Sequence, residues 1–297
     1  IERASNLLDQ FETKKKFIYD NSLLGLKFIL WGLFKKLVIA DNLAVAVDYS
    51  YDNYQDLSGL ANVLGAIFFS FQIYCDFSGY SDMAIGLSKL LGFELMQNFN
   101  YPYFSKSINE FWSRWHISLS TWFRDYVYIP LGGNKLGFNI QIRNIFIVFI
   151  LSGIWHGANW TFVIWGGLNF IYYLIELLVK WKTLRIPNFL KISTIFVFTT
   201  IAWIFFRSPN YYTALNFIES FQNPASFSFF ESKGLVVSNI VLLIFFIFIE
   251  FKGKNEIIPI NSFFRKKYLN YALYIFLVII IILFYNSEET PFIYFQF

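Results

Sequence analysis

Residues 144–175 read NIFIVFILSGIWHGANWTFVIWGGLNFIYYLI, a run of 32 positions in which one histidine is the sole titratable side chain apart from two tyrosines. A helix needs about 20 mostly apolar residues to cross the hydrocarbon layer of a membrane. The run, bounded by Arg143 and Glu176, is therefore too long for one span and too short for two full ones. Its middle, SGIWHGANW at residues 152–160, gathers glycines and polar side chains, so we expect a helix, a break and a second helix.

The break has a consequence for His156. Non-helical backbone at membrane depth is tolerated only where protein or a water-filled cavity covers it. We therefore expect the break to line a cavity that His156 faces. An ionisable side chain in such a place indicates function by default, although a buried histidine bonded to a neighbouring carbonyl or hydroxyl is the alternative.

The composition of the whole chain is that of a membrane protein. Of 297 residues, 56% are hydrophobic, 23% are aromatic and 15% are charged, whereas soluble domains are about 25% charged. Too few charged side chains remain to cover a water-soluble enzyme. The net charge of +4 is too small and dispersed for a nucleic-acid-binding protein. One cysteine and two histidines predict neither a disulfide framework nor a metal site.

Other uncharged runs predict further membrane spans. A weaker stretch at residues 22–40 contains Lys27, Lys35 and Lys36, whose ammonium groups are expected to reach toward lipid headgroups. The fold class predicted is therefore all-α and polytopic. The further runs lie at residues 57–75, 192–206, 234–249 and 268–287.

The chain is expected to form one membrane-embedded domain over residues 1–297. Residue 1 is Ile, and residues 1–16 are polar and charged without the layout of a signal peptide. We therefore expect this domain to lack its N-terminal helices.

Charged connections predict the orientation in the membrane. Residues 180–191 contain four basic and no acidic side chains, and residues 250–267 contain five basic and two acidic ones. Both connections are therefore expected on the cytoplasmic side. The connection at residues 207–233 has two of each sign and is expected outside, which by alternation places the C-terminus outside.

Residues 109–129, NEFWSRWHISLSTWFRDYVYI, follow a helical period without being a clean membrane span. We expect one amphipathic helix at the membrane interface or along a cavity. Glu110 and Arg114 stand four positions apart, so their side chains are expected to pair. The apolar face consists of Phe111, Trp115, Leu119, Trp122 and Tyr126.

Residues 74–82, YCDFSGYSD, place two carboxylates and several hydroxyls directly after a membrane run. This polar density predicts a cavity or water near Asp76 and Ser78. The alternative is a capping turn, in which Ser78, Ser81 or Asp82 bonds the first N–H groups of a helix at residues 83–91.

Two blocks carry a family resemblance. FNYPYFSKSINEFWSRWHISLSTWFRDYVYIPLGG at residues 99–133 and LSGIWHGANWTFVIWG at residues 151–166 resemble the membrane-bound O-acyltransferases, and more narrowly the bacterial alginate O-acetyltransferase branch. The resemblance runs from about Phe28 to the terminal PFIYFQF. It implies a helical fold with re-entrant or amphipathic helices around a tunnel, in which an acyl group from the cytoplasm meets an acceptor hydroxyl.

The resemblance also implies roles for individual residues. The histidine of its Trp-His-Gly block corresponds to His156, and its second polar position corresponds to His116; both are expected to be catalytic, with helix packing as the alternative for His116. Substrate contacts are expected from Trp155, Asn159, Trp160, Arg114, Trp115, Asp76 and Ser78.

The chemistry of acyl transfer fits these residues. A hydroxyl that attacks a thioester must lose its proton, and a neutral imidazole accepts protons near neutral pH. The oxyanion that develops needs hydrogen-bond donors. Asn159, an indole N–H of tryptophan or the backbone around Gly157 are the candidates, and the sequence does not choose among them.

The sequence thus predicts an O-acyltransferase in a bacterial cytoplasmic membrane. It is expected to use acetyl-CoA as co-substrate, to hold no bound cofactor, and to acetylate a secreted polysaccharide together with a secreted or periplasmic acetyltransferase partner, surrounded by membrane lipids. The alternative is a transporter or flippase of a lipid-linked or acyl substrate without covalent chemistry. Such proteins more often place Asp, Glu or Arg inside their spans, which favours the transferase.

Overall fold

The computed structural model of the chain describes residues 2–224, 233–261 and 263–285, and every regular element among them is helical. The chain divides into two compact units. Unit 1 contains residues 1–49, 71–98 and 229–296, and unit 2 contains residues 50–70 and 99–228. The prediction of one domain over residues 1–297 stays a prediction.

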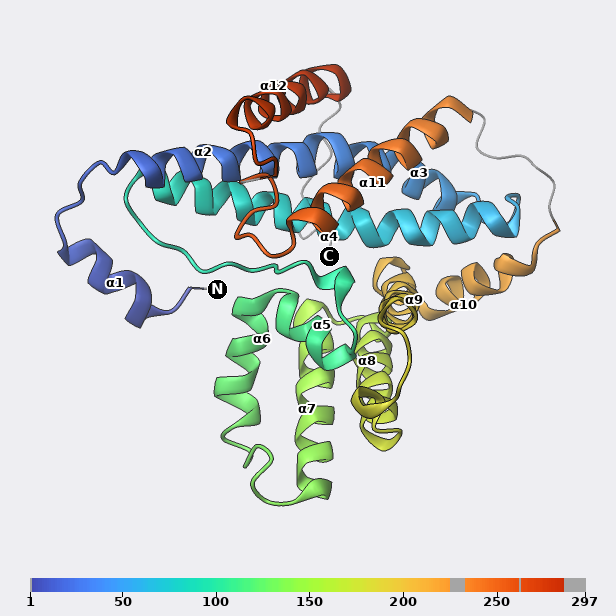
Figure 1. Cartoon of the computed structure of the whole chain (residues 1–297). Coiled ribbons are helices and arrows are strands. Elements are labelled where there is room, and N and C mark those ends of the chain that lie inside the picture. Colours follow the sequence, from blue (N-terminus) through green and yellow to red (C-terminus); the bar gives the residue numbers. More distant parts are fainter. Residues whose placement is uncertain (1, 225–232, 262, 286–297) are drawn as a thin grey trace. The chain divides into compact units, whose positions relative to one another are not determined.

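Unit 1 is built around two helices that run along each other, α2 and the second part of α4 (Figure 1). Their backbones approach closely at glycines: a Cβ atom on Gly25 would lie 2.7 Å from the carbonyl oxygen of Gly86. Small residues allow such close helix packing in membranes. The elements of this unit are α1 (Ala4–Glu12), α2 (Tyr19–Leu33), the π-helix η1 (Phe34–Ala40), most of α3 (Asp41–Asp52), the second part of α4 (Gly59–Leu90), α11 (Lys233–Gly253) and α12 (Lys267–Phe284).

Unit 2 contains three long helices, α7, α8 and α9, which pack in chain order, with the short helix α5 against α8 (Figure 1). Both sequence blocks with the family resemblance fall in this unit. Its elements are η2 (Pro102–Phe104), α5 (Ile108–Arg114), α6 (Ile117–Phe123), the π-helix η3 (Arg124–Tyr128), α7 (Phe138–His156), α8 (Trp160–Leu178), η4 (Trp181–Thr183), α9 (Asn188–Arg207), α10 (Tyr211–Glu219) and η5 (Ser220–Gln222).

Among the residues that the structure describes, six helices are long and apolar enough to cross a membrane: α4, α7, α8, α9, α11 and α12. The five uncharged runs fall largely in these helices, so the prediction of an all-α, multi-pass membrane chain is confirmed, whereas the weaker candidate at residues 22–40 forms α2 and η1, which are not among the six. The predicted orientation stays a prediction. Residues 225–232 of the connection expected outside, residues 286–287 of the last predicted span and the terminal PFIYFQF lie outside the described residues.

Residues 144–175 form parts of two full-length helices, so the expectation that the run is too short for two spans is wrong. Helices α7 and α8 have 19 residues each, about 28 Å at 1.5 Å per residue. Both charged boundaries lie inside helices because their side chains find partners: Arg143 donates to Asn144 Oδ1 at 2.9 Å, and Glu176 accepts from the N–H of Ile108. The expected helix, break and helix are confirmed, and the break at residues 157–159 joins two helices that are each long enough to cross a membrane.

Residues 109–129 do not form the single amphipathic helix expected. Helix α5 ends at Arg114 and α6 begins at Ile117, because His116 adopts a φ of +43°, outside the helical region. The pairing of Glu110 with Arg114 is confirmed, at 2.6 Å. On the predicted apolar face, the side chain of Tyr126 is exposed, since it follows this break and lies in η3.

Residues 74–83 lie inside the continuous helix α4, so the alternative of a capping turn before residues 83–91 is wrong. The expectation that the lysines reach toward headgroups is wrong for two of them. Lys35 is buried and lies 2.7 Å from Asp82, and Lys36 lies 2.6 Å from Asp76. These ion pairs satisfy the carboxylates, so the helix need not break for them to reach water.

The close packing of α7 on α8 makes a testable prediction at Gly166. A Cβ atom there would clash with the carbonyl oxygen of Phe149, whereas a Cβ atom on the adjacent Gly167 meets nothing within 4 Å. We expect Gly166→Ala to destabilise the protein by about 1–3 kcal/mol, as overpacking does. Gly167→Ala should be neutral or stabilise by up to about 1 kcal/mol through helix propensity. Thermal unfolding in detergent compares the two, and equal melting temperatures would contradict the packing.

Candidate functional site

His156 is the last residue of α7, just before the turn to α8. Its half-buried imidazole lies among aromatic rings, with centroid distances of 5.0 Å to Phe206, 5.3 Å to Trp165 and 5.0 Å to Trp155. These contacts fix the orientation of the ring. Proton transfer from a bound hydroxyl requires a base that is positioned in this way.

His116 is buried and lies between α5 and α6 in a left-handed conformation, which non-glycine residues adopt at an energetic cost and often at functional sites. Its Nδ1 accepts a long hydrogen bond of 3.4 Å from the N–H of Leu119. Burial, together with the nearby His156, lowers the pKa of His116 to about 3. The ring is therefore neutral at physiological pH and carries its proton on Nε2, which suits a hydrogen-bond donor better than a base.

An aromatic cluster connects the two histidines within unit 2. Trp115, which precedes His116, lies 5.0 Å from Trp203, and Trp203 stacks on Trp165 at 5.8 Å between ring centroids. Trp165 in turn contacts His156. Helices α5, α8 and α9 thus bring the two histidine-containing blocks together.

Trp203 is a residue of this cluster that the sequence did not single out. Its side chain is 2% exposed, and its indole N–H has no hydrogen-bond partner among the described residues. A buried donor without a partner costs about 1–3 kcal/mol, and such groups in native proteins call for an explanation. Nothing in the apolar run of residues 192–206 distinguished Trp203 from the other tryptophans.

The turn and the helix ends beside it also contain Asn159, Trp155 and Trp160, and the expectation that the turn lines a cavity stays a prediction. Asn159 caps α8: its Oδ1 accepts from the N–H of Thr161 at 3.1 Å, and its Nδ2 donates to the carbonyl of Pro209 at 2.7 Å. Both ends of its amide therefore hold the turn. Trp155 and Trp160 are 53% and 71% exposed, and their contact with substrate stays a prediction.

Arg114 and Trp115 shape the end of α5. The guanidinium of Arg114 is held by Glu110, and its carbonyl accepts from the N–H of Asn100 at 3.0 Å. Trp115 is buried and stacks on Phe111 at 5.5 Å. Both residues thus fix the position of His116, and a direct contact with substrate stays a prediction.

Asp76 and Ser78 belong to unit 1, whereas both histidines belong to unit 2. The carboxylate of Asp76 pairs with Lys36, and the hydroxyl of Ser78 accepts from Lys35 at 2.9 Å. The two side chains expected to contact substrate thus lie in a buried ion cluster of unit 1. Their substrate role stays a prediction.

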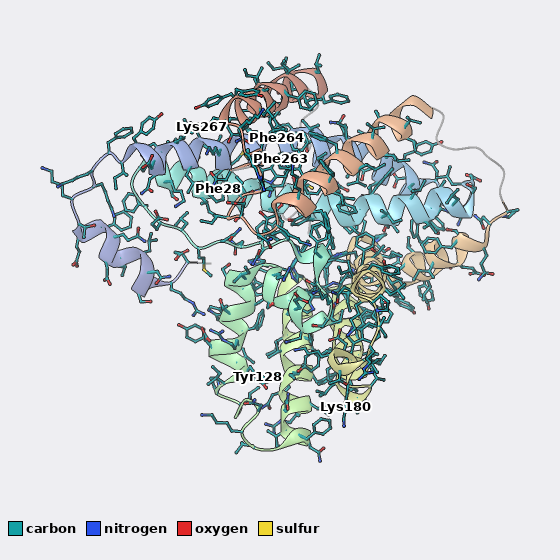
Figure 2. All side chains as sticks on the ribbon, viewed as in Figure 1. Phe28, Tyr128, Lys180, Phe263, Phe264 and Lys267 are labelled. Carbon is teal, nitrogen blue, oxygen red and sulfur yellow. The ribbon has the colours of Figure 1, made fainter. Side chains whose placement is uncertain are left out.

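Unit 2 also contains two adjoining pockets, of about 430 Å³ and 220 Å³, that share Asn109 and Tyr173. The smaller one is lined by Lys180 and Lys182, and Figure 2 shows Lys180 toward the same end of the unit as Tyr128, which lines the larger one. The larger one reaches Trp112, whose ring lies 5.5 Å from Trp165. It has hydroxyls on one wall and apolar side chains on the other, from Ser113, Ser120, Thr121, Ile145, Val148 and Phe149.

Together the two pockets extend from Lys180 and Lys182 to Trp112, which contacts Trp165 of the aromatic cluster. No group of three or more His, Cys, Asp or Glu side chains arranged to hold a metal is found in the described ranges. Neither histidine lines these two pockets; Trp112 of the larger pocket contacts Trp165, which in turn contacts His156.

Comparisons with known proteins agree with this arrangement. The chain is 41% identical over 246 residues to a probable alginate O-acetylase of Pseudomonas aeruginosa, covering 81% of this chain and 47% of the relative. It is 41% identical over 225 residues to a peptidoglycan O-acetyltransferase of Helicobacter pylori, covering 74% and 43%. A teichoic acid D-alanyltransferase of Bacillus subtilis is 39% identical over 114 residues, covering 36% and 29%.

These relatives are longer than the chain, which spans less than half the length of each. A sequence model of the membrane-bound O-acyltransferase family matches residues 3–214. That range includes both histidines, the aromatic cluster and the two adjoining pockets. The chain belongs to the membrane-bound O-acyltransferase family.

Proposed function

We propose that the protein is an O-acyltransferase that moves an acetyl group from a cytoplasmic thioester, acetyl-CoA, toward hydroxyls of a secreted polysaccharide. The observation that carries this proposal is the joining of His116 and His156 by the cluster of Trp115, Trp203 and Trp165. A structural histidine pair would not need an indole donor left without a partner between them.

His156 acts as the general base. The acceptor hydroxyl loses its proton to His156 as its oxygen attacks the carbonyl carbon of the thioester. The carbon–sulfur bond then breaks, and the proton passes to the departing thiolate, so that an ester and a thiol are formed. His116 stays neutral and donates through Nε2 to the oxygen that becomes negative, since Nδ1 is occupied.

Trp203 supplies a second donor to the oxyanion. Asn159 had been the amide candidate for this role, but its amide is engaged on both ends. The indole N–H of Trp203 is buried between the rings that contact the two histidines and has no partner among the described residues. A donor kept dry and unpaired is poised for charge that develops in the transition state.

This role makes a prediction for Trp203→Phe, which keeps an aromatic ring and removes the N–H. We expect kcat to fall about tenfold with KM nearly unchanged, because one hydrogen bond of about 1.5 kcal/mol is lost while other donors remain. Trp31→Phe, at a fully buried tryptophan of unit 1, is the control for the loss of ring size. Equal losses in both variants, or a loss confined to KM, would assign Trp203 to packing.

The acyl donor, acetyl-CoA, enters through the two adjoining pockets. Lys180 and Lys182 line the pocket at the end that the basic connection predicts to be cytoplasmic, where they would pair with phosphates of the co-substrate. The larger pocket, with one polar and one apolar wall, suits the long thioester arm and leads to Trp112, beside Trp165. No cofactor is needed beyond this co-substrate.

The acceptor is a polysaccharide on the outer side of the cytoplasmic membrane of a bacterium. The relatives from bacteria are described as acting on alginate, peptidoglycan and teichoic acid, which supports a cell-envelope acceptor and this inner-membrane location. A secreted or periplasmic acetyltransferase that completes the transfer is the expected protein partner.

The test follows labelled acetate. Membranes containing the protein and its partner receive acetyl-CoA labelled in the acetyl group, and alkali-labile acetate is measured on the polysaccharide. We expect label that depends on the protein. A transporter or flippase would instead move its substrate across vesicles without forming an ester, and that outcome would overturn the proposal.

A further inference from the structure

Unit 1 contains a pocket of about 290 Å³ whose walls include Lys14, Lys15, Lys16 and Lys89. Lys89 belongs to the last turn of α4, one of the six helices able to cross a membrane, and the other three lysines precede α2. The pocket therefore lies at the end of a membrane span, the level at which lipid headgroups are found.

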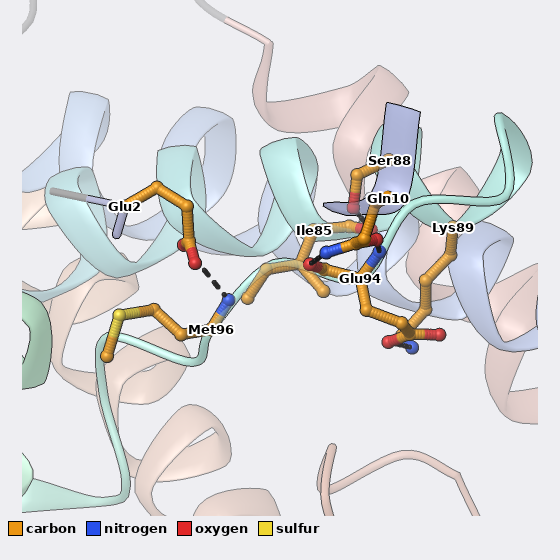
Figure 3. Close-up of polar contacts among 7 residues, drawn as sticks. All are labelled: Glu2, Gln10, Ile85, Ser88, Lys89, Glu94 and Met96. Carbon is orange, nitrogen blue, oxygen red and sulfur yellow. Dashed lines mark hydrogen bonds and ion pairs between the residues drawn. The ribbon is translucent and has the colours of Figure 1, made fainter. Parts of the chain in front are cut away.

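The pocket is held together by polar contacts between the N-terminal segment and the chain after α4 (Figure 3). The side-chain amide of Gln10, in α1, donates to the carbonyl of Glu94 at 2.9 Å and accepts from the N–H of Glu94 at 2.8 Å. Both backbone groups of Glu94 are thus bonded by one side chain. The side chain of Lys15 packs beside Gly92, where φ is +81°. The Nζ of Lys15 lies 4.5 Å from the centre of the Phe93 ring. Lys15 is thus held by the ring of Phe93, and Lys89 by its ion pair with Glu94.

The charges of the pocket are not balanced by the protein. Glu94 pairs with Lys89 at 2.6 Å and is itself 60% exposed. The ammonium groups of Lys14 and Lys16 make no hydrogen bond or ion pair with any residue that the structure describes. Four lysines and no carboxylate line the pocket, with Glu12, Asp20 and Glu94 next to it in the chain, and like charges on a shared lining repel unless an anion lies between them.

Exposed apolar side chains surround this charge. Phe11 is 65% exposed, Phe17 79%, Ile18 54% and Tyr19 68%. Aromatic and apolar residues next to lysines are typical of segments that lie in the membrane interface. The surface thus fits a ligand that has both a negative headgroup and acyl chains, and this combination distinguishes a phospholipid from a soluble phosphate.

The predicted cytoplasmic position of the lysine pocket agrees with an anionic lipid as its ligand. Gln97, which follows the pocket in the chain, donates to the carbonyl of Ile257 at 3.3 Å. Ile257 lies in the connection of residues 250–267, which its basic residues predict to be cytoplasmic. The cytoplasmic leaflet presents anionic lipids to basic clusters near the ends of spans.

We propose that the lysine pocket of Lys14, Lys15, Lys16 and Lys89 binds the phosphate of an anionic phospholipid headgroup, with the exposed aromatic residues against its acyl chains. The lipid fixes the segment between α1 and α2 at the membrane surface. This site is independent of acyl transfer, and its test does not depend on activity.

The test measures lipid retention by native mass spectrometry of the purified, detergent-solubilised protein. Phosphatidylglycerol is added to the parent and to Lys14→Gln/Lys16→Gln, which keeps the contact of Lys15 with Phe93. Each basic residue near an anionic surface contributes about fivefold in affinity, so we expect the variant to bind phosphatidylglycerol about 25-fold more weakly. Lys14→Arg/Lys16→Arg should retain binding, and size-exclusion elution checks that each variant is folded.

The matched control is Arg265→Gln/Lys267→Gln, which removes two exposed charges from the same unit and should leave phosphatidylglycerol retention unchanged. An equal loss in both double variants would reduce the effect to nonspecific attraction and overturn the proposal. Equal retention of phosphatidylcholine and phosphatidylglycerol by the parent would also overturn it. Displacement of the lipid by glycerol phosphate at the same concentration would assign the pocket to a soluble phosphate instead.

Discussion

Replacing His156 with glutamine is expected to lower acyl transfer by about 10²- to 10⁴-fold, the usual contribution of a general base. Glutamine keeps the polarity of the side chain and some of its hydrogen bonding, yet it cannot take up a proton. The imidazole is held by the rings of Phe206, Trp165 and Trp155, so a glutamine there should leave the turn in place. Transfer from labelled acetyl-CoA gives the activity.

Expression level, elution volume and melting temperature of His156→Gln should match those of the parent protein, because the side chain is half-buried and the amide of Asn159 holds the turn at both ends. A packing histidine would instead show itself through instability. If the folded variant retains more than about a tenth of parental turnover, the assignment of His156 as general base is wrong.

His116→Gln separates the two histidines. Its amide can still donate a hydrogen bond, so a donor role for His116 should leave much more activity than remains in His156→Gln. Losses of equal size in the two variants would instead make both imidazoles proton acceptors, against the occupied Nδ1 of His116.

Much of the fold could be predicted from the sequence because membrane spans are recognisable as long, uncharged and mostly apolar runs. The five uncharged runs fall largely in helices that can cross a membrane, since a helix satisfies its own backbone hydrogen bonds in lipid, whereas the weaker stretch at residues 22–40 forms the shorter elements α2 and η1. The helix ends were predicted less well. Arg143 and Glu176 marked ends by their charge, yet both lie inside helices because a neighbouring side chain or backbone group bonds each of them.

The site was predictable in its two histidines and not in its surroundings. The blocks around His116 and His156 are specific enough to name a family, but the cluster that joins them depends on helix packing between α5, α8 and α9. Trp203 has an ordinary apolar context in the sequence. Its unpaired N–H exists only in three dimensions, and no local pattern could have indicated it.

The lysines of residues 22–40 show how pairing reverses a prediction. A lone lysine in an apolar stretch extends toward water. Lys35 and Lys36 lie on the π-helix η1, and the carboxylates of Asp82 and Asp76, 40 or more residues later in the chain, lie within 2.7 Å of them. Sequence reasoning treated these four residues in two separate segments and so missed the buried ion pairs.

Removing one partner of the pair of Lys35 and Asp82 should therefore destabilise the protein, because it leaves the other charge buried without a counter-charge. Lys35→Met is expected to destabilise the protein by about 3–5 kcal/mol, because it leaves the carboxylate of Asp82 in a site where its side chain is 12% exposed and removes the charge that balanced it. Ser78 loses a bond from Lys35 as well. Chemical or thermal unfolding in detergent, together with the yield of folded protein, measures the change.

The double variant Lys35→Met/Asp82→Leu should recover most of that loss, because replacing both members of a buried ion pair with apolar side chains is often neutral or stabilising. Arg124→Met is the control for an exposed pair: Arg124 is 60% exposed beside Asp125, so its loss should cost at most about 1 kcal/mol. If the double variant is as unstable as Lys35→Met, the destabilisation comes from lost packing around Lys35 and not from an uncompensated charge. If Lys35→Met is as stable as the parent, the carboxylate of Asp82 has found another partner, and the ion pair is not what stabilises α4 against η1.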